Sequence, residues 1–105
     1  MIDDSQFNLM AAKLLLSQFG LPCDLAISGK KGIKLFKQRL EMQREDASIK
    51  PLQLIFLDYE MPIMDGEAVM GELVKIFQEE ESRPGQDFYR PKICCMSAHI
   101  ANNIR

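Results

Sequence analysis

The sequence predicts an α/β protein built around a parallel β-sheet. Along its 105 residues, segments with helical spacing of apolar residues alternate with short, strongly apolar segments of strand length. Such alternation is typical of a parallel sheet that carries helices on its faces. A chain of this length forms one small domain, 1–105, and is too short for two.

Three segments have the spacing of an amphipathic helix. They are 5–19, ended by Gly20 and Pro22, then 29–46, rich in charges, and a third that follows an Asp-Gly turn. Their apolar stripes are formed by Phe7, Met10, Ala11, Leu14 and Leu15 in the first, Ile33, Phe36 and Leu40 in the second, and Met70, Leu73, Val74 and Phe77 in the third.

Three further segments predict strands. Residues 23–28 form a short alternating strand, and 92–97 form a buried one. Residues 52–58 are almost continuously apolar, which predicts a strand covered on both faces. Residues 79–91 are polar and contain turn residues, so we expect a loop there.

Composition excludes several classes of protein. A net charge of −2 and a pI of about 5.4 give no electrostatic footprint for nucleic acid. No apolar run approaches the roughly 20 residues of a membrane span, and no secretion signal opens the chain, so we expect no membrane contact. Cys23, Cys94 and Cys95 fit neither a disulfide framework nor a zinc site. We expect them to be buried thiols in a reducing cytoplasm.

Polar groups follow the ends of the predicted strands. Asp58 ends the strand 52–58, Ser97 ends the next strand, and Asp3 and Asp4 come just before the first helix. Ligands of parallel sheets bind at the carboxyl ends of the strands, so we expect these four side chains to converge on one edge.

Three carboxylates in one place need compensation. Two like charges about 4 Å apart repel by about 4 kcal/mol at an effective dielectric constant near 20. A cluster of oxygen ligands suits Mg²⁺, which keeps several of its waters. A cation held there would also attract a phosphoryl group, and carboxylates can accept one. The residues therefore predict a magnesium site beside a phosphoryl acceptor.

The same motifs resemble the receiver domain of two-component response regulators. The resemblance is carried by "DD" before the first helix, "LIFLDYEMPIMDG" at the end of a buried strand and "CMSAH" after the next strand. It implies a flavodoxin-like, doubly wound parallel sheet over the whole chain. It also implies a phosphoprotein of phosphorelay signal transduction, whose receiver forms an aspartyl phosphate.

The resemblance implies a role for each site residue. Asp58 is the phosphoacceptor, and Ser97 donates a hydrogen bond to the phosphoryl group. Asp3 and Asp4 hold Mg²⁺ together with Asp58, with Asp4 as the more direct ligand and Asp3 acting largely through water. The backbone carbonyl of Glu60 supplies a further metal ligand. The phosphoryl donor is a phosphohistidine on a histidine kinase or a histidine phosphotransfer domain.

The chain departs from the family pattern at both ends. Only Met1 and Ile2 precede the acidic pair, so the first strand is reduced to a stub, and a fifth strand with its lysine and a fifth helix are absent. We therefore expect a receiver truncated at both ends, such as a fragment of a hybrid histidine kinase. Because its central strand is a stub, we expect weak protection of the backbone of residues 52–58.

Two alternatives are open at this point. The chain could be a degenerate receiver that acts as an unphosphorylated protein-interaction module, which the missing lysine favours. It could also be a phosphohydrolase of another α/β family, although Glu60 stands where such an enzyme would carry a second aspartate. The leading interpretation is a phosphoacceptor that assists its own phosphorylation and turns over no separate substrate.

Overall fold

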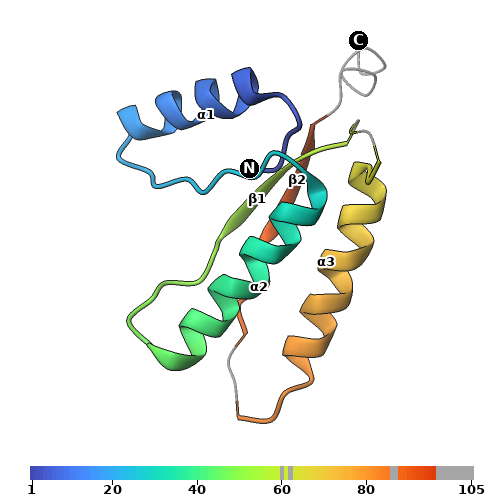
Figure 1. The fold of residues 1–105 in the computed structure, drawn as a ribbon. Helices are drawn as coiled ribbons and strands as arrows, with labels where there is room; N and C mark the ends of the chain where they lie inside the picture. The colour runs from blue at the N-terminus through green and yellow to red at the C-terminus, as the bar shows by residue number, and fades with distance from the viewer. Residues whose placement is uncertain (60, 62, 86–87, 97–105) are drawn as a thin grey trace.

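A computed structural model describes residues 1–59, 61, 63–85 and 88–96. Three helices and two strands follow one another along this part of the chain (Figure 1). Their bounds are α1 (Gln6–Gln18), α2 (Gly29–Glu45), β1 (Leu54–Asp58), α3 (Gly66–Glu81) and β2 (Lys92–Met96). Apart from the strand predicted over 23–28, the elements come in the order predicted from the sequence. None of the helices in this part of the chain is both long and apolar enough to cross a lipid bilayer.

The sheet is parallel, as predicted. β1 and β2 pair in register from Leu54 opposite Lys92 to Asp58 opposite Met96. On the other side of β1, Ile2 forms single parallel bridges both to Leu57 and to Ala26. The backbone order is therefore Ala26, Ile2, β1, β2, and the first strand is the stub that we expected.

The strand predicted over 23–28 is wrong, because only Ala26 of this segment pairs. A strand needs a neighbour of matching length to bond its backbone groups. Ile2 offers a single pairing position, so the rest of the segment has no ladder to join. The alternating pattern of the segment is compatible with a strand, but it does not show that Ile2 offers only one residue for pairing.

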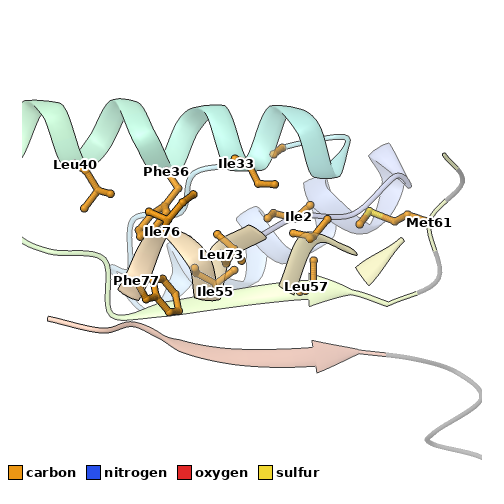
Figure 2. Close-up of a cluster of buried hydrophobic side chains, with 12 residues drawn as sticks. Ile2, Ile33, Phe36, Leu40, Ile55, Leu57, Met61, Leu73, Ile76 and Phe77 are labelled. Carbon is orange, nitrogen blue, oxygen red and sulfur yellow. The ribbon is translucent and has the colours of Figure 1, made fainter. Parts of the chain in front are cut away.

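The helices α2 and α3 lie side by side and cover one face of the sheet (Figure 1). Each begins at a side-chain cap: the Ser28 hydroxyl accepts from the Lys31 N–H, and the Asp65 carboxylate accepts from the Ala68 N–H. Between them and β1 lies the hydrophobic core, which Figure 2 shows in close-up. Its buried residues are Ile2, Ala26, Ile33, Phe36, Leu40, Ile55, Leu57, Met61, Val69, Leu73, Ile76 and Phe77.

Only one face of β1 is buried. Ile55 and Leu57 point into the core, whereas Leu54 is 44% exposed and Phe56 is half-buried. The prediction that 52–58 is covered on both faces is therefore wrong for the described part of the chain. The reason is that α2 and α3 both lie on the same side of the sheet. Cys94 of β2 is likewise exposed, and Cys23 and Cys95 are only half-buried, against our expectation that all three are buried.

Helix α1 is confirmed, but its predicted apolar stripe is not buried. Leu9 is its buried residue, while Phe7, Met10, Leu14 and Leu15 are all more than half exposed. In Figure 1 this helix is drawn clear of α2 and α3. Its apolar spacing therefore predicted the helix correctly and the buried face incorrectly.

The end of α3 corrects the loop predicted over 79–91. Helix α3 continues through Glu81, because its helical pattern meets no Gly or Pro before Pro84 and Gly85. Glu80 is buried on this last turn, and its carboxylate forms ion pairs with Arg44 of α2 and with Arg83. The glutamate therefore joins the carboxyl ends of the two helices.

Candidate functional site

Three carboxylates meet at the carboxyl end of β1. Asp58 is the last residue of β1, and Asp3 and Asp4 directly follow the bridging residue Ile2. Each of the three offers one carboxylate oxygen, and these oxygens all lie within 4.8 Å of one another. The structure thus brings together the three acidic side chains that the strand-end positions predicted to be neighbours.

The backbone around Ile2 sets this arrangement. The Ile2 N–H donates to the Phe56 carbonyl at 2.8 Å, and the Ile2 carbonyl accepts from the Asp58 N–H at 2.8 Å. On the other side, the Asp3 N–H donates to the Ala26 carbonyl at 3.1 Å. A single residue therefore fixes the register between the acidic pair and Asp58.

Each carboxylate has a different environment. Asp3 is only 3% exposed, and its two oxygens accept hydrogen bonds from the Ser5 N–H at 2.8 Å and from the Asn8 side-chain amide at 3.3 Å. Asp58 is half-buried and Asp4 is exposed. The buried acid is thus held in one orientation by α1, while the exposed acid faces solvent. The hydrogen bonds of Ser5 and Asn8 to Asp3 were missed from the sequence, which signals only that Ser5 is a suitable N-cap for α1.

The segment after Asp58 packs closely against the start of α3. The Tyr59 N–H donates to the Met96 carbonyl at 2.9 Å, and the Gly66 N–H donates to the Tyr59 carbonyl at 3.1 Å. Burial raises the pKa of Tyr59 above its usual value, and the nearby acidic groups of Glu67, Cys95 and Asp65 raise it further. Tyr59 is therefore a neutral phenol at physiological pH.

Two apolar residues of this loop behave differently. Met61 is buried in the core at 7% exposure. Ile63 is 109% exposed and has a backbone φ of +69°. A β-branched residue rarely adopts this left-handed conformation. Backbone strain and an unburied apolar side chain thus coincide a few residues from Asp58, and the sequence gave no signal of either.

The three carboxylates fit a magnesium ion. Mg²⁺ binds oxygen ligands at about 2.0–2.1 Å, so two ligands on opposite sides of the ion are about 4.2 Å apart. The oxygens of Asp3, Asp4 and Asp58 lie within 4.8 Å of one another, which allows direct ligation after a small contraction or ligation of one acid through water. Oxygen-only ligands with solvent access on one side are typical of Mg²⁺ sites.

Two of the predicted site residues cannot be placed. Ser97 and Glu60 lie outside the described residues, as does Pro62 of the same loop. The hydrogen bond expected from Ser97 and the metal contact expected from the Glu60 carbonyl therefore stay predictions.

Comparison with known proteins relates the chain to histidine kinases. It is 30% identical to probable histidine kinase 2 of Oryza sativa subsp. indica over 102 residues, which are 94% of this chain and 9% of that protein. It is 33% identical to hybrid signal transduction histidine kinase F of Dictyostelium discoideum over 79 residues, 75% of this chain and 6% of that protein. The chain thus spans less than a tenth of these relatives. No family model matches it.

Solved structures share the fold. The receiver domain of the histidine kinase CKI1 from Arabidopsis thaliana, solved in complex with Mg²⁺, superimposes with a TM-score of 0.70 and 24% identity, covering 98% of this chain and 86% of that one. A CheY-like receiver domain protein from Methanospirillum hungatei gives a TM-score of 0.61 and 20% identity, covering 98% and 84%. The predicted flavodoxin-like fold, incomplete in the described residues, is thereby confirmed. The chain thus shares the fold of receiver domains and is similar to part of histidine kinases, and both findings support a receiver domain.

Proposed function

We propose that residues 1–105 form a phosphorelay receiver that accepts a phosphoryl group from a phosphohistidine onto Asp58. The observation that carries the proposal is the meeting of Asp3, Asp4 and Asp58 within 4.8 Å at the carboxyl end of β1. Ligands bind at this edge of a doubly wound sheet. The similarity to histidine kinases supports a role in two-component signal transduction.

The proposed reaction is an in-line displacement at phosphorus. A carboxylate oxygen of Asp58 forms a new P–O bond while the P–N bond to the donor histidine breaks, and the electron pair of that bond returns to the imidazole nitrogen. The product is an aspartyl phosphate. Water then attacks the phosphorus, which releases inorganic phosphate and restores the carboxylate. The domain thereby promotes its own phosphorylation and acts on no separate substrate.

Asp3, Asp4 and Asp58 would hold Mg²⁺, and the carbonyl of Glu60 is proposed as a further ligand. When bound, the ion neutralises charge on the phosphoryl oxygens. Asp3 is buried and already accepts two hydrogen bonds, whereas Asp4 is exposed, which favours Asp4 as the direct ligand and Asp3 as a ligand through water. Ser97 is proposed to donate a hydrogen bond to the phosphoryl group.

The proposed partner is a histidine kinase or a histidine phosphotransfer domain in the cytoplasm. The kinase names of the relatives support this choice. A phosphohistidine and an aspartate can react only when the donor protein docks over the exposed side of the acidic cluster, where Asp4 lies.

Intact mass measurement tests the proposal. The chain is incubated with Mg²⁺ and acetyl phosphate, beside Asp58→Asn and beside Asp65→Asn as a matched control on the same loop. We expect one phosphoryl increment of mass in the wild type and in Asp65→Asn. We expect none in Asp58→Asn or after chelation of the metal.

Two results would contradict the proposal. A folded wild-type chain that gains no mass would favour the degenerate receiver, which binds partners without phosphorylation. Repeated turnover of unrelated phosphoesters, insensitive to Asp58→Asn, would favour a phosphohydrolase instead.

A further inference from the structure

We propose that Gly66 is a positioning residue for the phosphoacceptor. Its missing side chain lets α3 begin in direct contact with the backbone of Asp58 and Tyr59, and this contact fixes where the Asp58 carboxylate lies relative to Asp3 and Asp4. The inference rests on the proposed function of Asp58, and it adds a residue that touches neither metal nor phosphoryl group.

The contact is too close for any side chain at position 66. A Cβ atom on Gly66 would lie 2.4 Å from the Cα of Tyr59, 2.7 Å from its Cδ1 and 2.9 Å from the carbonyl oxygen of Asp58. Ordinary van der Waals contacts of a Cβ atom are 3.4–4 Å. Two of the three neighbours are backbone atoms, which cannot rotate away as the end of a side chain can.

Backbone conformation does not explain this glycine. Among the described residues, the glycines in the left-handed region are Gly20 and Gly85, and Gly66 is not one of them. An alanine could therefore adopt the backbone conformation of Gly66 without strain. The requirement for glycine comes from the close approach of α3 to the end of β1.

The end of β1 is held on three sides. The Asp58 N–H bonds to Ile2, the Tyr59 N–H bonds to Met96, and the Tyr59 carbonyl accepts from the Gly66 N–H. Gly66 forms the third side of this frame. The peptide that joins Asp58 to Tyr59 is therefore held by Ile2 on one side, by β2 on the other and by the start of α3.

A methyl group at position 66 must push the start of α3 and the end of β1 apart. Helix α3 is anchored in the core by Val69 and Leu73, both 0% exposed, and its first turn is capped by Asp65. At the contact itself the strand end is less deeply packed, since Tyr59 is half-buried, although Met61 two residues later is buried in the core. Because the carbonyl of Asp58 is one of the atoms in this contact, the separation would change the position of Asp58 relative to Asp3 and Asp4.

Three variants of the full chain test the inference. Gly66→Ala adds the methyl group at the contact. Gly71→Ala is the matched control, because it makes the same change on the same helix where nothing lies within 4 Å. Ile76→Val truncates a core residue of α3 and controls for loss of stability alone. Each variant is measured for Mg²⁺ affinity by calorimetry and for phosphorylation rate with acetyl phosphate at saturating Mg²⁺.

We expect Gly66→Ala to reduce both Mg²⁺ affinity and phosphorylation rate by about ten-fold or more, because misplacements near 1 Å cost up to about 100-fold. Gly71→Ala and Ile76→Val should keep both values within about two-fold of the wild type, the second despite a lower melting temperature. The inference is overturned if folded Gly66→Ala matches the wild type, or if Ile76→Val loses as much as Gly66→Ala.

A measurement on the wild type covers the case in which Gly66→Ala does not fold. The amide resonance of Gly66 should shift when Mg²⁺ and beryllium fluoride, a phosphoryl analogue, are added, and that of Gly71 should not. Equal behaviour of the two amides would overturn the inference. A wild-type chain that binds no Mg²⁺ and gains no phosphoryl group would overturn the proposed function as well, so the two failures are distinguishable.

Discussion

Ile63 has two unfavourable properties at a single position. Its side chain is fully exposed, and its backbone φ of +69° places a β-branched residue in the left-handed region. Such a conformation costs about 1–3 kcal/mol relative to an unstrained one. The neighbouring Met61 is buried in the core, so the loop is held by other residues while Ile63 contributes no burial.

We predict that Ile63→Asn stabilises the protein. Asparagine adopts the left-handed conformation more readily than isoleucine, and its polar side chain is suited to full exposure. The free energy of unfolding should therefore rise by about 1 kcal/mol. Urea denaturation followed by circular dichroism measures the change. Ile27→Asn serves as a control, because Ile27 is also exposed (40%) and its φ is not positive. Equal effects of the two substitutions would show that polarity and not strain is responsible.

Single residues differ in how far the sequence could predict them. Asp58 was identified because an apolar strand that ends on a carboxylate is visible in the sequence alone. The positive φ of Ile63 and the close contact at Gly66 were not predicted, because neither follows from a local sequence pattern, and the contact at Gly66 arises only where α3 meets β1. Local patterns report which residue types are present, whereas clearances of tenths of an ångström arise only when elements pack.

For helix α1, the sequence predicted that the helix forms but not which of its faces is buried. Its apolar spacing predicted residues 5–19, and the helix runs from Gln6 to Gln18. The spacing did not predict which face is covered, because that depends on the neighbouring elements. Leu9 lies outside the predicted stripe and is the residue that is buried, at 4% exposure.

A pair of leucines on α1 tests this assignment. We predict that Leu9→Ala lowers the free energy of unfolding by about 2–3 kcal/mol, because it removes buried methyl groups and leaves a cavity. Leu14→Ala is the matched control, since Leu14 is 66% exposed, and it should change stability by less than about 0.5 kcal/mol. Chemical denaturation of both variants gives the comparison. A larger loss from Leu14→Ala would mean that the predicted stripe is buried after all.

For the strands as well, the local sequence pattern does not show which neighbouring elements are available. β1 and β2 fall within the predicted segments 52–58 and 92–97, because apolar runs of strand length that follow a proline favour a strand over a helix. The segment 23–28 has a weaker, alternating pattern and pairs only at Ala26. Strand formation requires a partner, and Ile2 provides only one position of pairing.

At the scale of the whole molecule, the acidic cluster joins two parts of the chain through Ile2. The core between α2, α3 and β1 is continuous, with Leu57, Val69 and Leu73 fully buried. The amino-terminal acids attach to this core through the bridges of Ile2 to Ala26 and Leu57. An apolar groove of about 490 Å³, lined by Met1, Phe36, Leu54 and Phe56 among others, lies next to this attachment. None of the three acids lines it.

We predict that this attachment opens more readily than the core. The Asp58 amide, bonded to Ile2, should exchange its hydrogen at a lower opening free energy than the Leu57 amide within the β1–β2 ladder, because chain ends open locally before the core. Hydrogen exchange followed by NMR resolves the two amides. Addition of millimolar Mg²⁺ should slow exchange at Asp58 and leave Leu57 nearly unchanged. Equal opening free energies would show that the amino-terminal residues are as firmly held as the sheet.

The bridge at Ile2 would make the attachment of the amino-terminal residues depend on the concentration of magnesium. An ion bound by Asp3 and Asp4 on one side of the bridge and by Asp58 on the other would hold the amino-terminal residues against the sheet. Metal binding and the attachment of these residues would therefore be thermodynamically linked. When the free ion concentration is a hundred times the dissociation constant, such binding stabilises the attached state by about 2.7 kcal/mol. The divalent ion would then serve the architecture of this receiver as well as its chemistry.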